Sequence, residues 1–131
     1  GALGDQSAEV RVRAAWAIGT IAPSRAPAAL IAALRDADPH VREMAAWALG
    51  QIRDPAAVPA LAAVPGDEHS KARYEAQWAL ARIGGEAARL HLTEALRHQS
   101  SGSPLPEWIS GALAGRTPKG RPRPWPDPTG R

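Results

Sequence analysis

The residues best suited to hold a metal ion or to move a proton are the four histidines and their acidic neighbours. His91, Glu94 and His98 fall at positions i, i+3 and i+7, on one face of an expected helix. His40 and Glu43 form a second pair at i and i+3. A metal centre needs three or four converging ligands with hydrogen-bonded support. We therefore interpret both groups as solvated polar faces of helices and predict no metal.

The sequence contains few residues that could carry out other kinds of catalysis. The chain has no Cys, which excludes thiol catalysis, zinc ribbons and disulfide frameworks. It shows no nucleophile paired with a base, no phosphate-binding loop and no cluster of carboxylates suited to acid–base work. We expect a protein that is not an enzyme and that carries no cofactor.

The tryptophans reveal an internal repeat. Trp16, Trp47 and Trp78 are 31 residues apart, within the segments EVRVRAAWAIGTI, HVREMAAWALGQI and KARYEAQWALARI. Other residues keep the same spacing: Asp5, Asp36 and Asp67; Arg11, Arg42 and Arg73; Ile21, Ile52 and Ile83; Leu30, Leu61 and Leu92. This period is typical of a solenoid of helix pairs.

Each repeat is predicted to hold two helices. In the middle repeat the first helix begins at Asp38-Pro39, with Asp as N-cap and Pro at the first helical position, and ends at Gly50. The second helix ends near Val64, before Pro65-Gly66. In the third repeat it runs from about Glu86 to His98.

The predicted organisation is a repeat array over residues 1–101, with repeats near 5–35, 36–66 and 67–98. Ala2-Leu3-Gly4-Asp5 aligns with Ala33-Leu34-Arg35-Asp36, so we expect the sequence to begin inside a second helix of a longer array. Residues 102–115 are expected to form a short capping helix, and residues 116–131 a basic, proline-rich flexible tail. The expected capping face consists of Trp108, Ile109, Ala112 and Leu113.

Composition and charge narrow the class further. The 131 residues suit one domain, and no apolar run approaches the ~20 residues that span a bilayer. Residues 1–101 carry 11 basic and 11 acidic side chains, so the net charge of +3 lies entirely in residues 102–131. We expect a cytoplasmic monomer with a neutral body, for which nucleic acid and membrane are unfavoured partners.

The pattern D-x-D-x-x-V-R-x-x-A-A-W-A-L-G-x-I in residues 36–52 resembles the short HEAT-like repeats first named from phycobilisome lyases. It is also similar to the artificial alpha-helicoidal repeat proteins built from that consensus. The resemblance covers about residues 2–98 and implies an all-α, right-handed solenoid of antiparallel helix pairs. For function it implies little, because the family mixes binding scaffolds with a few enzymes.

One enzymatic branch of the family, the deoxyhypusine hydroxylase type, binds two irons through His-Glu pairs on the first helix. The matching positions here hold Val12-Arg13, Glu43-Met44 and Tyr74-Glu75, so that chemistry is absent. The resemblance also implies an Asp–Arg ladder between neighbouring repeats, for which Asp36 and Arg42 are placed. Arg11, Arg42 and Arg73 are accordingly interpreted as structural residues.

A helical wheel assigns one apolar stripe to every first helix. Its members lie six and two residues before, and two and five residues after, each Trp: Val10, Val41 and Ala72; Ala14, Ala45 and Ala76; Ile18, Leu49 and Leu80; Ile21, Ile52 and Ile83. The Trp side chains lie roughly opposite this stripe. Each of them either packs flat against the first helix of the next repeat or belongs to a recognition surface.

The resemblance favours recognition, because the matching positions line the concave binding face of the artificial repeat proteins. The predicted binding residues, which we call the aromatic face, are Trp16, Trp47, Trp78, Tyr74, Met44, Arg13, Arg82, Gln51, Glu43 and Val12. The expected partner is a protein or an extended peptide. A proline-rich peptide is one form, and the chain's own Arg121–Pro128 segment could compete for the same groove.

The alternative is a nucleic-acid-binding helical repeat. It would place Arg13, Lys71, Arg82 and the basic tail on phosphates and stack the tryptophans on bases. The neutral body argues against it.

Overall fold

A computed structural model describes residues 7–64, 71–97, 111, 112 and 114 of the chain. Within these residues it contains α-helices and short 3₁₀ helices but no strand. The elements are α1 (Ala8–Ile21), α2 (Ala28–Ala32), η2 (Ala33–Arg35), α3 (Pro39–Ile52), η3 (Pro55–Ala57), α4 (Val58–Ala62), α5 (Lys71–Ile83) and α6 (Gly85–Arg97). In each of the first two repeats a long first helix is followed by a short second helix. A turn of 3₁₀ helix lies directly after the second helix of the first repeat (η2) and directly before that of the second repeat (η3).

Aspartate and proline start the helices of the middle repeat. The Asp38 side chain accepts a hydrogen bond from the backbone N–H of His40, and Pro39 opens α3, as the sequence predicted. Asp54 does the same for Ala56 at the start of η3. Asp54 also accepts from the backbone N–H of Ala26 at 2.9 Å, which ties the loop of the first repeat to that of the second.

The first helices all end in the same way. Ala22, Arg53 and Gly84 follow α1, α3 and α5 at 31-residue intervals and have φ angles of 49°, 62° and 72°. Each donates its backbone N–H to a carbonyl four residues earlier, at 2.8 to 2.9 Å. This left-handed cap terminates each helix and turns the chain toward the second helix of the repeat.

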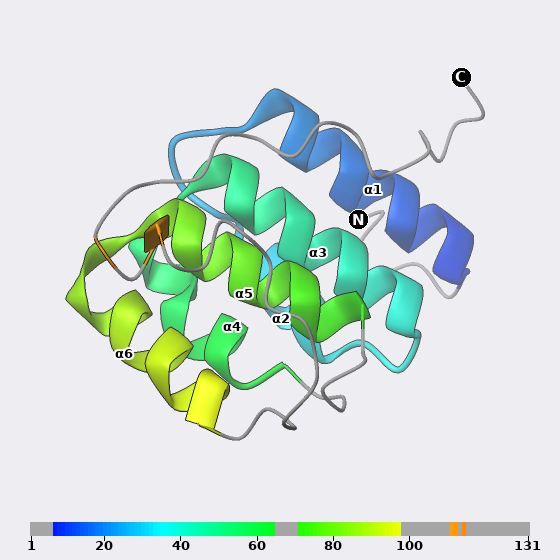
Figure 1. Cartoon of the computed structure of the whole chain (residues 1–131). Helices are drawn as coiled ribbons and strands as arrows, with labels where there is room; N and C mark the ends of the chain where they lie inside the picture. Colours follow the sequence, from blue (N-terminus) through cyan, green and yellow to red (C-terminus); the bar gives the residue numbers. More distant parts are fainter. Residues whose placement is uncertain (1–6, 65–70, 98–110, 113, 115–131) are drawn as a thin grey trace.

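The first helices form one layer and the second helices another. In the cartoon α1, α3 and α5 lie side by side, and α4 and α6 lie on the other side of α5 (Figure 1). In the first two repeats the second helix packs chiefly against the first helix of the next repeat, α2 and η2 against α3 and α4 against α5, whereas α6 packs against α5 of its own repeat. Because α2, η2 and α4 pack against the next repeat, a single hydrophobic core runs along the stack, as expected for a solenoid.

The apolar stripe forms the core in α3 and α5. Val41, Ala45, Leu49 and Ile52 are buried in α3, as are Ala72, Ala76 and Leu80 in α5, and Leu30, Leu34 and Leu61 meet them from the second helices. In α1 the prediction is wrong for Val10 and Ile21, which are 37% and 76% exposed, whereas Ile18 is half-buried against the core. The reason is positional, because no described helix covers that side of α1.

The helix bounds follow the sequence prediction with small shifts. α3 continues to Ile52, two residues beyond the predicted end at Gly50, and α6 ends at Arg97. Ala112, one member of the expected capping face, is buried within the core. Trp108, Ile109 and Leu113 lie outside the described residues, as do residues 116–131.

Candidate binding face of the first helices

Trp47 and Trp78 each pack against a glycine of the preceding repeat and so join neighbouring repeats. A Cβ atom placed on Gly19 would stand 2.6 Å from Cζ3 of Trp47, and one placed on Gly50 would stand 2.5 Å from Cζ3 of Trp78. Each indole therefore lies against a glycine of the preceding first helix, in space that only a residue without a side chain leaves open. The sequence analysis considered packing of each Trp against the first helix of the next repeat. Trp47 and Trp78 pack instead against the first helix of the preceding repeat.

Trp78 also contacts Arg82, which lies one turn later on the same helix. The guanidinium carbon of Arg82 lies 5.8 Å from the centroid of the Trp78 ring, within cation–π range. Arg82 Nε also donates to the carbonyl of Gly50 at 3.3 Å. Burial lowers the pKa of Arg82, and the charge of nearby Arg53 lowers it further. These contacts hold the indole of α5 against Gly50 of α3.

Three residues of the aromatic face are closed to solvent. Trp78 is 0%, Met44 2% and Glu43 8% exposed, which corrects the expectation that they lie open on this face. Met44 and its equivalent Glu75 on α5 are buried, whereas the equivalent Arg13 on α1 is exposed, so this position is closed where a described first helix precedes it. Trp78 is enclosed by Gly50 and Arg82.

The rest of the aromatic face keeps some exposure. Trp16, Trp47 and Tyr74 are half-buried, one on each of α1, α3 and α5, and Val12, Gln51 and Arg82 are half-buried as well. Arg13 is exposed and pairs with Glu9 at 2.8 Å. Oε1 of Gln51 is buried and accepts no hydrogen bond from the part of the chain that the structure describes. The accessible part of the aromatic face therefore consists of aromatic side chains, the amide side chain of Gln51 and the charged side chains of Arg13 and Arg82.

One rung of the Asp–Arg ladder lies within the described residues, and its partners differ from those expected. The carboxylate of Asp36 accepts from Nε and Nη2 of Arg11, in the preceding repeat, at 2.8 and 3.0 Å. Arg42 instead donates to the backbone carbonyl of Asp36 at 2.7 Å. Burial alone would raise the pKa of Asp36. The hydrogen bonds from Arg11 and from the Asp38 backbone outweigh it, so this pKa lies below its ordinary value.

The candidate metal ligands form no site among the described residues. His40 Nδ1 lies 3.8 Å from Oε2 of Glu43, the distance of a weak ion pair. His91 and Glu94 are exposed on α6, and His98 lies outside the described residues.

Sequence reasoning missed the role of Gly19 and Gly50. The signal was present, because both follow a Trp by three residues at the 31-residue period. Without the structure nothing showed that the glycine of one repeat receives the indole of the next.

Helix pairs stacked with a constant offset define the class of the protein, an all-α solenoid. The HEAT repeat profile matches residues 1–64, and the PBS lyase HEAT-like repeat profile matches residues 72–98. The chain belongs to the HEAT-like repeat family. No curated protein matches it. HEAT repeats generally serve as scaffolds for protein interaction. In the described part of the chain, no helix combines the length and apolarity needed to cross a bilayer.

Proposed function

We propose that the chain is a non-catalytic scaffold that binds a protein or an extended peptide on the aromatic face. The observation that carries the proposal is that Trp16, Trp47 and Tyr74, one on each of three adjacent first helices, are half-buried and not fully enclosed. Half-buried aromatic residues present a large, rigid contact surface and are frequent anchors of protein interfaces.

Two features support a role of this face in binding. Trp47 rests on Gly19, so the ring is held in place before any partner arrives, which lowers the entropy lost on binding. Gln51 is half-buried as well and adds a polar amide group to the accessible part of the face.

The basic residues favour protein over nucleic acid. Arg13 is paired with Glu9, and Arg82 is hydrogen-bonded to the carbonyl of Gly50 and stacked on Trp78. Phosphate binding relies on basic side chains that can release counterions. Two of the three basic residues that a nucleic-acid function would use on the body are already committed to contacts within the protein.

Photo-crosslinking at Trp16 tests the proposal. Trp16 packs on no described preceding helix, so replacing it perturbs the stack least. The chain carrying benzoylphenylalanine at position 16 is irradiated in lysate with and without nuclease treatment, and the matched control carries it at Leu90, an exposed apolar residue of α6. We expect a protein crosslinked only from position 16.

The partner so identified should bind the Trp16→Ala variant about tenfold more weakly, while circular dichroism shows an unchanged fold. Crosslinks that are equal from both positions, or that disappear with nuclease, would refute a protein-binding role for the aromatic face.

A further inference from the structure

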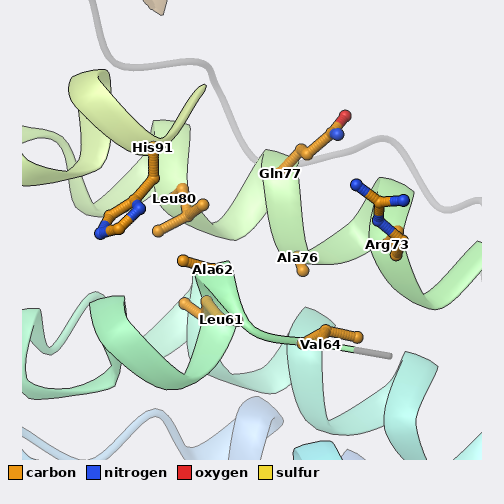
Figure 2. Close-up of a pocket in the computed structure, with 8 residues that line it drawn as sticks. All are labelled: Leu61, Ala62, Val64, Arg73, Ala76, Gln77, Leu80 and His91. Atoms are coloured by element: carbon orange, nitrogen blue, oxygen red, sulfur yellow. The ribbon is translucent and has the colours of Figure 1, made fainter. Parts of the chain in front are cut away.

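The side of α5 that meets the second helices is nearly filled. Leu61 of α4 lies toward Leu80 of α5, and His91 of α6 lines the same seam (Figure 2). The cavity left between α4, α5 and α6 measures only about 30 Å³, which is room for little more than a water molecule. A partner's side chain therefore finds no space in this seam.

The C-terminal ends of α3 and α5 instead carry two arginines that link the two helices. Nε of Arg53 donates to the carbonyl of Arg82 at 2.9 Å, and Nε of Arg82 donates to the carbonyl of Gly50 at 3.3 Å. Each bond joins one repeat to its neighbour. The Arg53 side chain is therefore held in place before any ligand arrives, which lowers the entropy lost on binding.

Two positive charges lie close together at this end of the stack. Burial lowers the pKa of Arg82, and the charge of Arg53 lowers it further. Because an arginine keeps its proton at neutral pH, deprotonation does not relieve the repulsion between the two charges. A bound anion relieves it, so this position favours a negatively charged ligand over a neutral one.

Arg53 has the donors that such a ligand needs. It is exposed, and its Nη groups donate no hydrogen bond to any residue that the structure describes. The carboxylate that follows it in the chain, that of Asp54, accepts instead from the backbone N–H groups of Ala26 and Ala56. The two Nη groups of an arginine match the two oxygens of a carboxylate.

The backbone at Arg53 also points to a role of its side chain. Its equivalents in the other repeats are Ala22 and Gly84, and all three residues have a positive φ. Glycine adopts this conformation most readily, whereas a side chain raises its energy. Residues kept in such conformations cluster at functional sites. The middle repeat thus places a long basic side chain where a glycine would be more stable.

We propose that Arg53 binds a carboxylate of the protein or peptide that occupies the aromatic face, while Arg82 positions Arg53 through its carbonyl and adds a second positive charge. The inference rests on the proposed function, because Arg82 belongs to the aromatic face and the carboxylate belongs to its partner. The partner is thereby expected to carry an acidic residue beside the groups that contact the aromatic side chains.

An acidic peptide tests the carboxylate site without the partner. The probe is acetyl-Glu-Ala-Glu-Ala-Glu-amide, and its control is the same peptide with Gln in place of each Glu, both at equal ionic strength. In NMR of the labelled chain we expect saturable shifts of the Nε–H signals of Arg53 and Arg82 with the acidic peptide only. Equal shifts with the Gln peptide would overturn the inference, as would tighter binding at Arg53 of a thymidine oligonucleotide of equal charge, which would assign the site to nucleic acid.

Matched variants separate binding from folding. Arg53→Gly suits the left-handed backbone, so the chain should stay folded by circular dichroism while the acidic peptide binds about threefold more weakly. Arg35→Gln removes one positive charge from an exposed position of η2 and should leave peptide binding unchanged. Equal weakening by both variants would show that net charge, not the Arg53 site, attracts the peptide.

The protein crosslinked from position 16 distinguishes this inference from the proposed function. Arg53→Gly should weaken its binding about threefold and Arg35→Gln should not. Full affinity for the Arg53→Gly chain together with loss of affinity for the Trp16→Ala chain would refute the carboxylate contact and leave the scaffold function standing. Absence of any crosslinked protein would refute the scaffold function, whatever the acidic peptide does at Arg53.

Discussion

At the scale of single residues, the contact of Trp78 with Gly50 sets how closely α3 and α5 approach. A methyl group at Gly50 would meet Cζ3 and Cε3 of the indole at 2.5 and 2.9 Å. We expect Gly50→Ala to lower the free energy of unfolding by about 1–3 kcal/mol through overpacking. Trp78→Ala should lower it by about 3–5 kcal/mol. The double variant should lose less than the sum, because removing the indole makes room for the methyl group. Urea unfolding of the four proteins measures this coupling.

Gly19 provides the matched comparison. A Cβ there would collide with the Cα of Ala48 at 2.8 Å as well as with Trp47, so truncating Trp47 does not clear the space. The Gly19 and Trp47 pair should therefore be closer to additive than the Gly50 and Trp78 pair. Equal coupling in the two cycles would contradict the described geometry.

The Asp36 carboxylate makes stability depend on pH. Its pKa in the folded chain lies below the unfolded value of about 3.9. Its contribution is therefore complete above that value and is lost as the pH falls through the folded pKa. At pH 7 we expect Asp36→Asn to lower the free energy of unfolding by about 1–2 kcal/mol, between the values for exposed ion pairs and for charged hydrogen bonds. The difference from the parent chain should stay constant from pH 7 to about pH 5 and shrink as the pH falls below about 4. A difference that does not change in this acidic range would count against the Arg11 contact.

At the scale of the helix, the left-handed caps give a prediction with opposite signs at two equivalent sites. Ala22 has a φ of 49° and Gly84 a φ of 72°, and a side chain at Gly84 would meet nothing within 4 Å. The effect of substitution at these sites is therefore mainly that of backbone conformation. Ala22→Gly should raise the free energy of unfolding by about 0.5–1 kcal/mol, and Gly84→Ala should lower it by about 1 kcal/mol. Thermal or urea unfolding measures both. Arg53 is unsuitable for the comparison because its side chain donates to the carbonyl of Arg82 at 2.9 Å.

The 31-residue period predicted the positions of the helices well, but it predicted less well which residues of one helix are covered by another. The 31-residue spacing located α3 and its Asp38 cap, because these depend on local sequence. The wheel also assigned Val41 and Leu49 correctly to the core. It could not show that Ile21 is exposed, since the same stripe is buried or open according to whether another helix lies on it. It could not place Trp78 either, because its burial depends on Gly50 in a different repeat.

At the scale of the whole molecule, α3 is the helix with a first helix on each side. It packs against both α1 and α5, whereas α1 has α3 as its only first-helix neighbour in the described chain. In a solenoid each repeat is stabilised chiefly by the repeats next to it. Opening α3 therefore exposes two interfaces and opening α1 only one.

Hydrogen exchange should follow this order. We expect the slowest amides of α3 to exchange at least about tenfold more slowly than those of α1, because α1 can detach while α3 and α5 remain packed. Native-state exchange followed by NMR measures both helices in one experiment. Ala48→Gly should accelerate exchange in α1 as well as in α3, because Ala48 lies at the contact of α3 with Gly19. Equal exchange rates for α1 and α3 in both proteins would contradict this prediction. The stack would then open as a single cooperative unit, and α1 could not detach while α3 and α5 stay packed.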